Sequence, residues 1–150
     1  MSFKIVVDSC CDLTPQMMKE GCYIKVPLTI RSGGSVFVDD ESFDQADLLT
    51  SMKADANAPS TACPSPQAYL DAYESGEGDI YVVTLSALLS GSHNSAEQAK
   101  RLLEEEQPDR NVYVFNSCSA SAGEALVALK IRELAGAGLS FDQVIHQVEQ

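Results

Sequence analysis

Three short apolar segments constrain the fold of this chain more than any other feature. Each is rich in β-branched or aromatic residues, and none shows the alternation expected of a strand with one solvated face. Continuous apolar runs of this length are typical of strands buried on both sides, as in a parallel sheet covered by helices. Small polar residues follow each run. The three runs are Ile5–Val7, Ile80–Leu85 and Val112–Phe115.

Segments with helical periodicity lie between and after these runs. Ser65 and Pro66 form an N-cap followed by proline at the first helical position. Ala96, Ala99 and Leu103 recur at the spacing of one helical face. Strands that alternate with helices predict an α/β fold with a mainly parallel sheet flanked by helices. Further helices are expected from Asp44 through Met52, over Val127–Leu134, and from Ser140 to the end of the chain.

A fourth β-rich segment, Ile24–Ile30, is interrupted by Pro27. Proline cannot donate a backbone hydrogen bond, so this segment is expected at a sheet edge or as a bulged strand. Ser32–Ser35 then predicts a hairpin turn into Val36–Val38.

The charge distribution excludes several function classes. The chain has 150 residues and a net charge of −12, and residues 1–75 and 76–150 each carry 5 basic and 11 acidic side chains. Without a basic face, nucleic-acid binding is not expected. No apolar run approaches the ~20 residues of a membrane helix, and the first residues lack a signal-peptide layout, so a cytoplasmic protein without stable membrane insertion is expected.

The length predicts a single domain over residues 1–150. The amphipathic pattern of the last helix still continues at Gln150, where no capping signal ends it. We therefore expect a first domain whose second domain is absent or truncated.

Loops that follow the expected parallel strands should meet at one edge of the sheet, where such folds bind ligands. Three loops qualify by position, and a fourth, Ala58–Pro64, precedes a helix and can reach the same edge. All four are rich in hydroxyl side chains. The three are Asp8–Asp12, Ser86–Ser92 and Asn116–Ser121.

Cationic side chains are missing from these loops, and none occurs between Lys53 and Lys100. An anion bound there must be held by hydroxyls, backbone N–H groups and a helix N-terminus. A phosphate usually attracts Arg or Lys as well, whereas a single carboxylate can be bound without one. Ser90, Gly91 and Ser92 are the candidate site, with Gly91 permitting a tight turn. The alternative is that these serines only cap the following helix.

Enzyme chemistry is the competing hypothesis. A small acyl hydrolase or transferase would use Ser90 or a thiol at this edge, with His93 three residues after Ser90. However, the Gly-x-Ser-x-Gly elbow of many hydrolases is absent. Asp8 and Asp12 are better explained as loop caps than as ligands of a hard metal.

Five cysteines occur, an odd number without any Cys-x-x-Cys spacing, so neither disulfides nor a zinc site is expected. No cofactor is predicted. A third hypothesis is a metal or redox site that joins cysteines from three of the loops. The cysteines are Cys10, Cys11, Cys22, Cys63 and Cys118, and the third hypothesis uses Cys10, Cys63 and Cys118.

The loop motifs resemble those of the DegV family of bacterial fatty-acid-binding proteins. Ile5–Leu13 is similar to the family's strand followed by Asp-Ser and Asp-Leu, and Pro27 begins a similar Pro-Leu pair. The most specific match is Leu85–Ser95 (LSALLSGSHNS), which is similar to Leu-Ser-Ser-x-Leu-Ser-Gly-Thr-Tyr-x-Ser. Ser60–Ser65 resembles Thr-Ser-Gln-Pro-Ser, and Asn116–Gly123 resembles Asp-Ser followed by Ser-x-Gly.

The resemblance implies a lipid-binding carrier and not an enzyme. Family members hold a long-chain fatty acid in a tunnel that a second domain completes. A separate fatty acid kinase, a dihydroxyacetone-kinase-like protein, phosphorylates the bound fatty acid. Thr61 and Ser90 match the residues that hydrogen-bond the carboxylate, and Gly91 and Ser92 are expected to add backbone donors.

The sequence departs from the family pattern beside these positions. Ala62 and Cys63 replace the Ser-Gln of the first motif, Ala87 replaces a serine, and His93 replaces the usual tyrosine.

Overall fold

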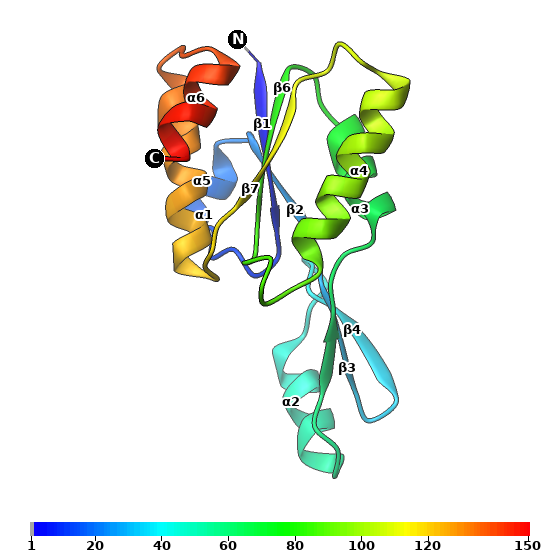
Figure 1. Cartoon of the computed structure of the whole chain (residues 1–150). Helices are drawn as coiled ribbons and strands as arrows, with labels where there is room; N and C mark the ends of the chain where they lie inside the picture. The colour runs from blue at the N-terminus through cyan, green and yellow to red at the C-terminus, as the bar shows by residue number, and fades with distance from the viewer. Residues whose placement is uncertain (1) are drawn as a thin grey trace.

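A computed structural model describes residues 2–150 of the chain. Its main sheet has four parallel strands in the order β2-β1-β6-β7 (Figure 1). The three apolar runs form three neighbouring strands of this sheet, so the predicted parallel sheet is confirmed. In register, Val6 lies beside Val82, which lies beside Val114. The strands are β1 (Phe3–Asp8), β2 (Tyr23–Val26), β6 (Asp79–Thr84) and β7 (Val112–Asn116).

Helices cover both faces of the main sheet (Figure 1). Ile5 and Val7 pack into the core beneath α1, α5 and α6, whereas Val6 packs into the opposite core beneath α3 and α4. Burial on both faces explains why β1 is apolar at successive positions. None of the helices in residues 2–150 is long and apolar enough to cross a membrane. The helices are α1 (Pro15–Lys19), α3 (Pro66–Glu74), α4 (Ser92–Glu106), α5 (Ala122–Gly136) and α6 (Phe141–Val148).

The predicted helix starts are confirmed by their caps. The Ser65 hydroxyl accepts a hydrogen bond from the Ala68 N–H at 3.2 Å, ahead of Pro66 at the first helical turn. Ser140 and Gln143 form a reciprocal capping box at the start of α6.

A small lobe projects beyond the carboxyl ends of the main strands (Figure 1). It contains an antiparallel sheet in the order β4-β3-β5 and one helix. The chain enters this lobe after Pro27, and the Ser9 hydroxyl accepts a hydrogen bond from the Leu28 N–H at 3.0 Å at the crossing. The elements are β3 (Thr29–Ser32), β4 (Ser35–Val38), α2 (Gln45–Ala54) and β5 (Ser60–Ala62).

The lobe corrects two expectations. Ile24–Ile30, expected as one strand, divides at Pro27 between two sheets, and Ala58–Pro64, expected as a loop, contains β5. All three residues of β5 are exposed, so the apolar signal of a buried strand is absent. In α2 only Leu48 is buried, because the thin lobe offers little surface to cover Leu49 and Met52.

Helix α5 provides a matched test of the core beneath it. Ile131 is fully buried, whereas Leu126 on the same helix is 67% exposed. We predict that Ile131→Ala lowers the free energy of unfolding by about 2–5 kcal/mol, because it removes buried methyl groups and leaves a cavity. Leu126→Ala should change it by less than about 0.5 kcal/mol. Urea denaturation measures both, and equal losses would contradict this packing.

Candidate functional site

The loops after β1, β6 and β7 gather at the carboxyl edge of the main sheet, where the small lobe begins (Figure 1). Hydrogen bonds join them directly. The Leu85 N–H donates to Asp8 Oδ2 at 2.8 Å, and the Ala87 N–H donates to Asn116 Oδ1 at 3.1 Å. The predicted meeting of these three loops is therefore confirmed.

Ser90, Gly91 and Ser92 form the turn into α4. The Ser90 hydroxyl oxygen accepts a hydrogen bond from the Ser92 N–H at 3.1 Å and lies 3.0 Å from the Ser92 hydroxyl oxygen. Ser90 is half-buried and Ser92 is fully buried. The Ser92 N–H is thus engaged inside the turn, and its expected part as a backbone donor to a ligand stays a prediction.

Gly91 is favoured by close packing and not by its backbone angle. Its φ of −73° is available to any residue. However, a Cβ atom at this position would lie 2.9 Å from the Cys63 Sγ atom. Gly91 thus lies in the expected turn, and the chain between β5 and α3 also packs closely against the start of α4 at this position.

This contact brings the small lobe to the candidate site. Thr61 lies on β5, two residues before Cys63, and its side chain is exposed. The Cys63 Sγ atom also lies 4.0 Å from the Ser95 hydroxyl oxygen, one turn into α4. The two predicted carboxylate-binding residues, Thr61 and Ser90, therefore flank a contact between the lobe and the main layer.

Two carboxyl groups are fully buried beneath the loops, at Asp8 and Glu124. Burial raises the pKa of Asp8 above its ordinary value, although the N–H groups of Leu85 and Cys10 donate to this carboxylate. Burial, followed by the charge of Asp8, raises the pKa of Glu124 to about 8. Glu124 was not predicted as a site residue, although its capping box with Ser121 is a recognisable Ser-x-x-Glu signal.

The alternative chemistries find little support in this geometry. His93 Nδ1 lies 3.2 Å from the Thr84 hydroxyl oxygen, while the Ser90 hydroxyl is paired with Ser92, so no Ser–His hydrogen bond forms within residues 2–150. Burial raises the pKa of the Cys10 thiol to about 11, which keeps it protonated and poorly nucleophilic near neutral pH.

The cysteine hypothesis is tested by the positions of the five thiols. Cys63 and Cys118 are exposed, and Cys11 is buried with its pKa raised to about 12 by burial. All five thiols are free. Across the described part of the chain, no group of three His, Cys, Asp or Glu side chains is arranged to hold a metal ion.

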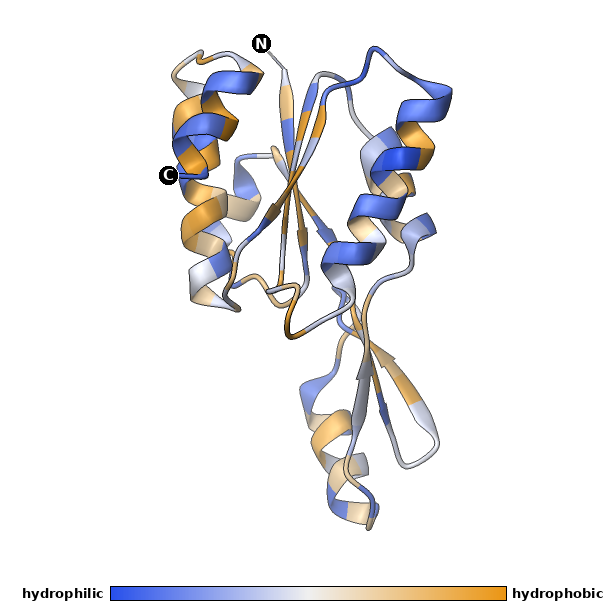
Figure 2. Ribbon diagram, in the orientation of Figure 1, coloured by the Kyte–Doolittle hydropathy of each residue, from blue (hydrophilic) through white to orange (hydrophobic). Residues whose placement is uncertain are grey.

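An exposed apolar segment lies immediately before Ser90. Leu88 is 96% exposed and Leu89 is 73% exposed, in the β6–α4 loop at the bottom of the main sheet (Figure 2). Apolar side chains next to hydroxyl groups can contact a ligand that has both a hydrocarbon part and a small polar group. The edge is therefore suited chemically to an amphipathic anion.

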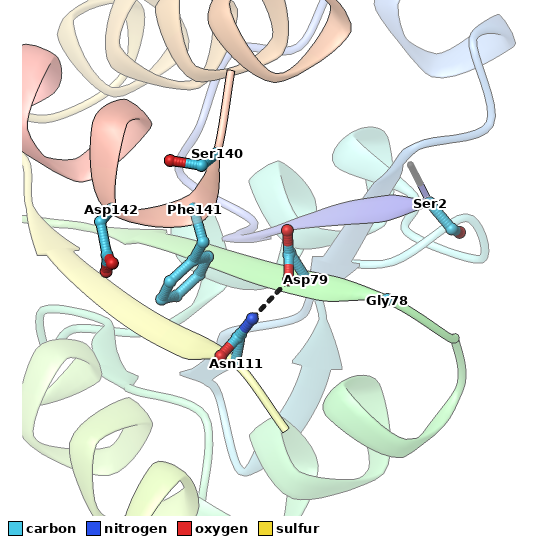
Figure 3. A pocket seen from close by; sticks show the side chains of 7 residues that line it. All are labelled: Ser2, Gly78, Asp79, Asn111, Ser140, Phe141 and Asp142. Atoms are coloured by element: carbon cyan, nitrogen blue, oxygen red, sulfur yellow. Dashed lines mark hydrogen bonds between the residues drawn. The ribbon is translucent and has the colours of Figure 1, made fainter. Parts of the chain in front are cut away.

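A different hollow lies at the opposite edge, near the amino ends of β6 and β7. Phe141 and Asp142 of α6 and an Asp79–Asn111 hydrogen bond of 2.8 Å line it (Figure 3). None of the predicted site residues contributes to this hollow. Its position also differs from the carboxyl edge at which parallel sheets bind ligands.

The Gly91–Cys63 contact generates a test by double-mutant cycle. Gly91→Ala should lower the free energy of unfolding by about 1 kcal/mol or more, because the added methyl group overlaps the sulfur atom. Cys63→Ala alone should have a small effect, and in the Gly91→Ala background it should recover most of the loss. Chemical denaturation of the four proteins measures the coupling. Strictly additive effects would contradict the contact.

Solved structures with this fold were found by comparison. A DegV family protein from Ruminococcus gnavus, described with vaccenic acid, has a TM-score of 0.94 and 44% identity, and the match covers 99% of this chain and 54% of that one. The fatty acid kinase (Fak) B3 protein of Streptococcus pneumoniae, loaded with linoleic acid, has a TM-score of 0.90 and 39% identity, covering 99% and 53% of the two chains.

Sequence relatives agree with the structural ones. A DegV domain-containing protein of Streptococcus pyogenes is 41% identical over 150 residues, which is 99% of this chain and 53% of the relative. The chain thus spans about half the length of the curated relatives it matches. The family model described as "Uncharacterised protein, DegV family" matches residues 2–150. The chain therefore belongs to the DegV family.

Proposed function

We propose that this chain is the N-terminal lipid-binding domain of a fatty-acid carrier. The observation that carries the proposal is the chemistry of the sheet edge at Ser90. The loop there has hydroxyl side chains and no cationic side chain, and Leu88 and Leu89 are exposed beside Ser90. A long-chain fatty acid has matching chemistry, since it combines one negative charge with a hydrocarbon tail. Relatives described with vaccenic acid and linoleic acid support this choice of ligand.

Head-group binding in this proposal uses hydroxyl donors from two parts of the fold. Thr61 donates from β5 of the small lobe, and Ser90 donates from the β6–α4 loop of the main layer. Gly91 stands at the N-terminus of the 15-residue helix α4, whose dipole favours a negative charge. Ser92 acts behind Ser90 and holds its oxygen through the N–H at 3.1 Å.

The proposed carrier presents its ligand to another protein and does not transform it. A separate fatty acid kinase of the dihydroxyacetone-kinase-like class would phosphorylate the exposed carboxylate in the cytoplasm. The relative named as a fatty acid kinase B3 protein supports this partner. A second domain in the remainder of the protein would cover Leu88, Leu89 and the lipid tail, since apolar side chains this exposed are stabilised by contact.

Substitution of Ser90 tests the proposed head-group contact. Ser90→Ala removes one hydrogen bond to a charged group, so affinity for linoleic acid should weaken by about 1.5–3 kcal/mol. Isothermal titration calorimetry with the intact protein, in which this chain forms one domain of the proposed carrier, measures the change. Ser117→Ala is the matched control, because its hydroxyl donates to the Ser119 carbonyl within a neighbouring loop at 3.2 Å.

An unchanged affinity in Ser90→Ala, or an equal loss in both variants, would contradict the assignment. The competing enzyme hypothesis predicts a different result. Turnover of an acyl ester that disappears in Ser90→Ala would favour a hydrolase or transferase over a carrier.

A further inference from the structure

The acid pair Asp8 and Glu124 has no part in the proposed head-group contacts, yet it lies directly beneath them. Both residues are fully buried and come from separate elements, β1 and the first turn of α5. A buried pair of carboxyl groups is costly when both are ionised, because the two charges repel in a medium of low dielectric constant. The pair is therefore expected to retain one proton.

The hydrogen bonds indicate which residue carries this proton. Both oxygens of Asp8 accept backbone N–H groups, from Leu85 at 2.8 Å and from Cys10 at 3.2 Å, which favours the ionised form. Glu124 accepts only the Ser121 N–H, at 3.1 Å through Oε2. Glu124 Oε1 has no hydrogen-bond partner of ordinary geometry within residues 2–150, although the carboxyl group lies close to Asp8. The proton thus resides on Glu124.

A short chain of polar groups links this pair to the candidate site. The Ser92 hydroxyl favours the ionised form of Asp8 and so lowers the Asp8 pKa, and the Leu85 N–H donates to Asp8 Oδ2 at 2.8 Å. The Ser92 hydroxyl oxygen lies 3.0 Å from the Ser90 hydroxyl oxygen. Asp8 therefore contacts the loop after β6 through Leu85 and lies near Ser92, and Ser92 in turn contacts Ser90. Ser92 is fully buried, so water does not screen this path.

We propose that neutral Glu124 is the residue that keeps this edge able to accept an anion, so that head-group binding is coupled to one proton held inside the fold. The inference rests on the proposed binding of a carboxylate at Ser90. Ionised Glu124 would place a second negative charge behind a site that has no cation in its loops. A like charge in a medium of effective dielectric about 20 weakens anion binding about tenfold even at a separation of about 12 Å.

The relevant pH range follows from the groups around Glu124. Since burial raises the Glu124 pKa to about 8, the neutral form predominates at pH 7 and the ionised form at pH 9. Burial raises the pKa of Cys10 to about 11 and that of Cys11 to about 12, and it also raises the pKa of Tyr69, so these groups stay neutral. Asp8 and Asp12 supply the facing negative charges, and Ser121 and Ser92 supply the facing hydroxyls.

Glu124→Gln is an isosteric test. Glutamine at this position can still accept the Ser121 N–H and complete the capping box, but it cannot ionise. Affinity of the intact protein for linoleic acid should fall about fivefold more between pH 7 and pH 9 in the wild type than in Glu124→Gln, because a tenfold coupling is only partly expressed within this pH range. Titration of the fatty acid itself contributes equally to both proteins and cancels from this ratio.

A second measurement needs no variant. Since a bound anion raises the Glu124 pKa, binding near pH 8.5 should take up about half a proton per ligand if the coupling is tenfold. Calorimetry in two buffers of different ionisation enthalpy measures this uptake in the wild type. Binding without proton uptake, or with the same pH dependence in both proteins, would overturn this inference alone. Failure of both proteins to bind linoleic acid at pH 7 would overturn the proposed function, and the inference with it.

Discussion

The buried carboxylate of Asp8 is the interaction on which the rest of the site depends. It ends β1 and receives the N–H groups of Leu85 and Cys10, so it fixes the loop after β6 relative to the loop after β1. A charged acceptor in a buried position makes stronger hydrogen bonds than a neutral one, and loss of its partners would leave an unpaired charge. The turn that contains Ser90 starts only five residues after Leu85. The position of this turn therefore depends on the hydrogen bonds that Asp8 accepts.

The candidate site uses hydroxyls where many anion sites use arginine. An ammonium or guanidinium group would bind a carboxylate more strongly, but it would also form an ion pair with Asp8 or Glu124. Hydroxyl donors avoid this competition, which is consistent with the proposed carrier, because a ligand held without an ion pair is more easily released. The same choice makes the site sensitive to every negative charge behind it, since no local cation offsets that charge.

Much of the fold could be predicted from the sequence because its signals are local. Apolar runs at Ile5 and Val112, the Ser65–Pro66 cap and the Ser140 capping box each act within a few residues, and each is confirmed. In the small lobe the hairpin at Ser32–Ser35 and the helix after Asp44 are confirmed, whereas β5 was missed, because its exposed residues carry no apolar signal and pair with β3 only after the chain has folded.

The candidate site was predictable in part, because some of its signals are also local in the sequence. Ser90 lies in a motif that is continuous in sequence, so its position at the sheet edge could be inferred. Glu124 was missed as a site residue because its importance arises from Asp8, which is more than 100 residues away in the sequence. No pattern around Glu124 indicates that the two carboxyl groups are close in the fold. The close contact at Gly91 was not predicted for a similar reason, since its partner atom belongs to Cys63 in another part of the chain.

The division of the molecule into a main layer and a projecting lobe has a consequence for the proposed site. Thr61 stands on one body and Ser90 on the other, and the chain crosses between them at Leu28 beside Ser9. Mutations inside the lobe can shift Thr61 without disturbing the two large cores. The separation between Thr61 and Ser90, the two hydroxyls of the proposed site, can therefore change through residues that lie in neither large core.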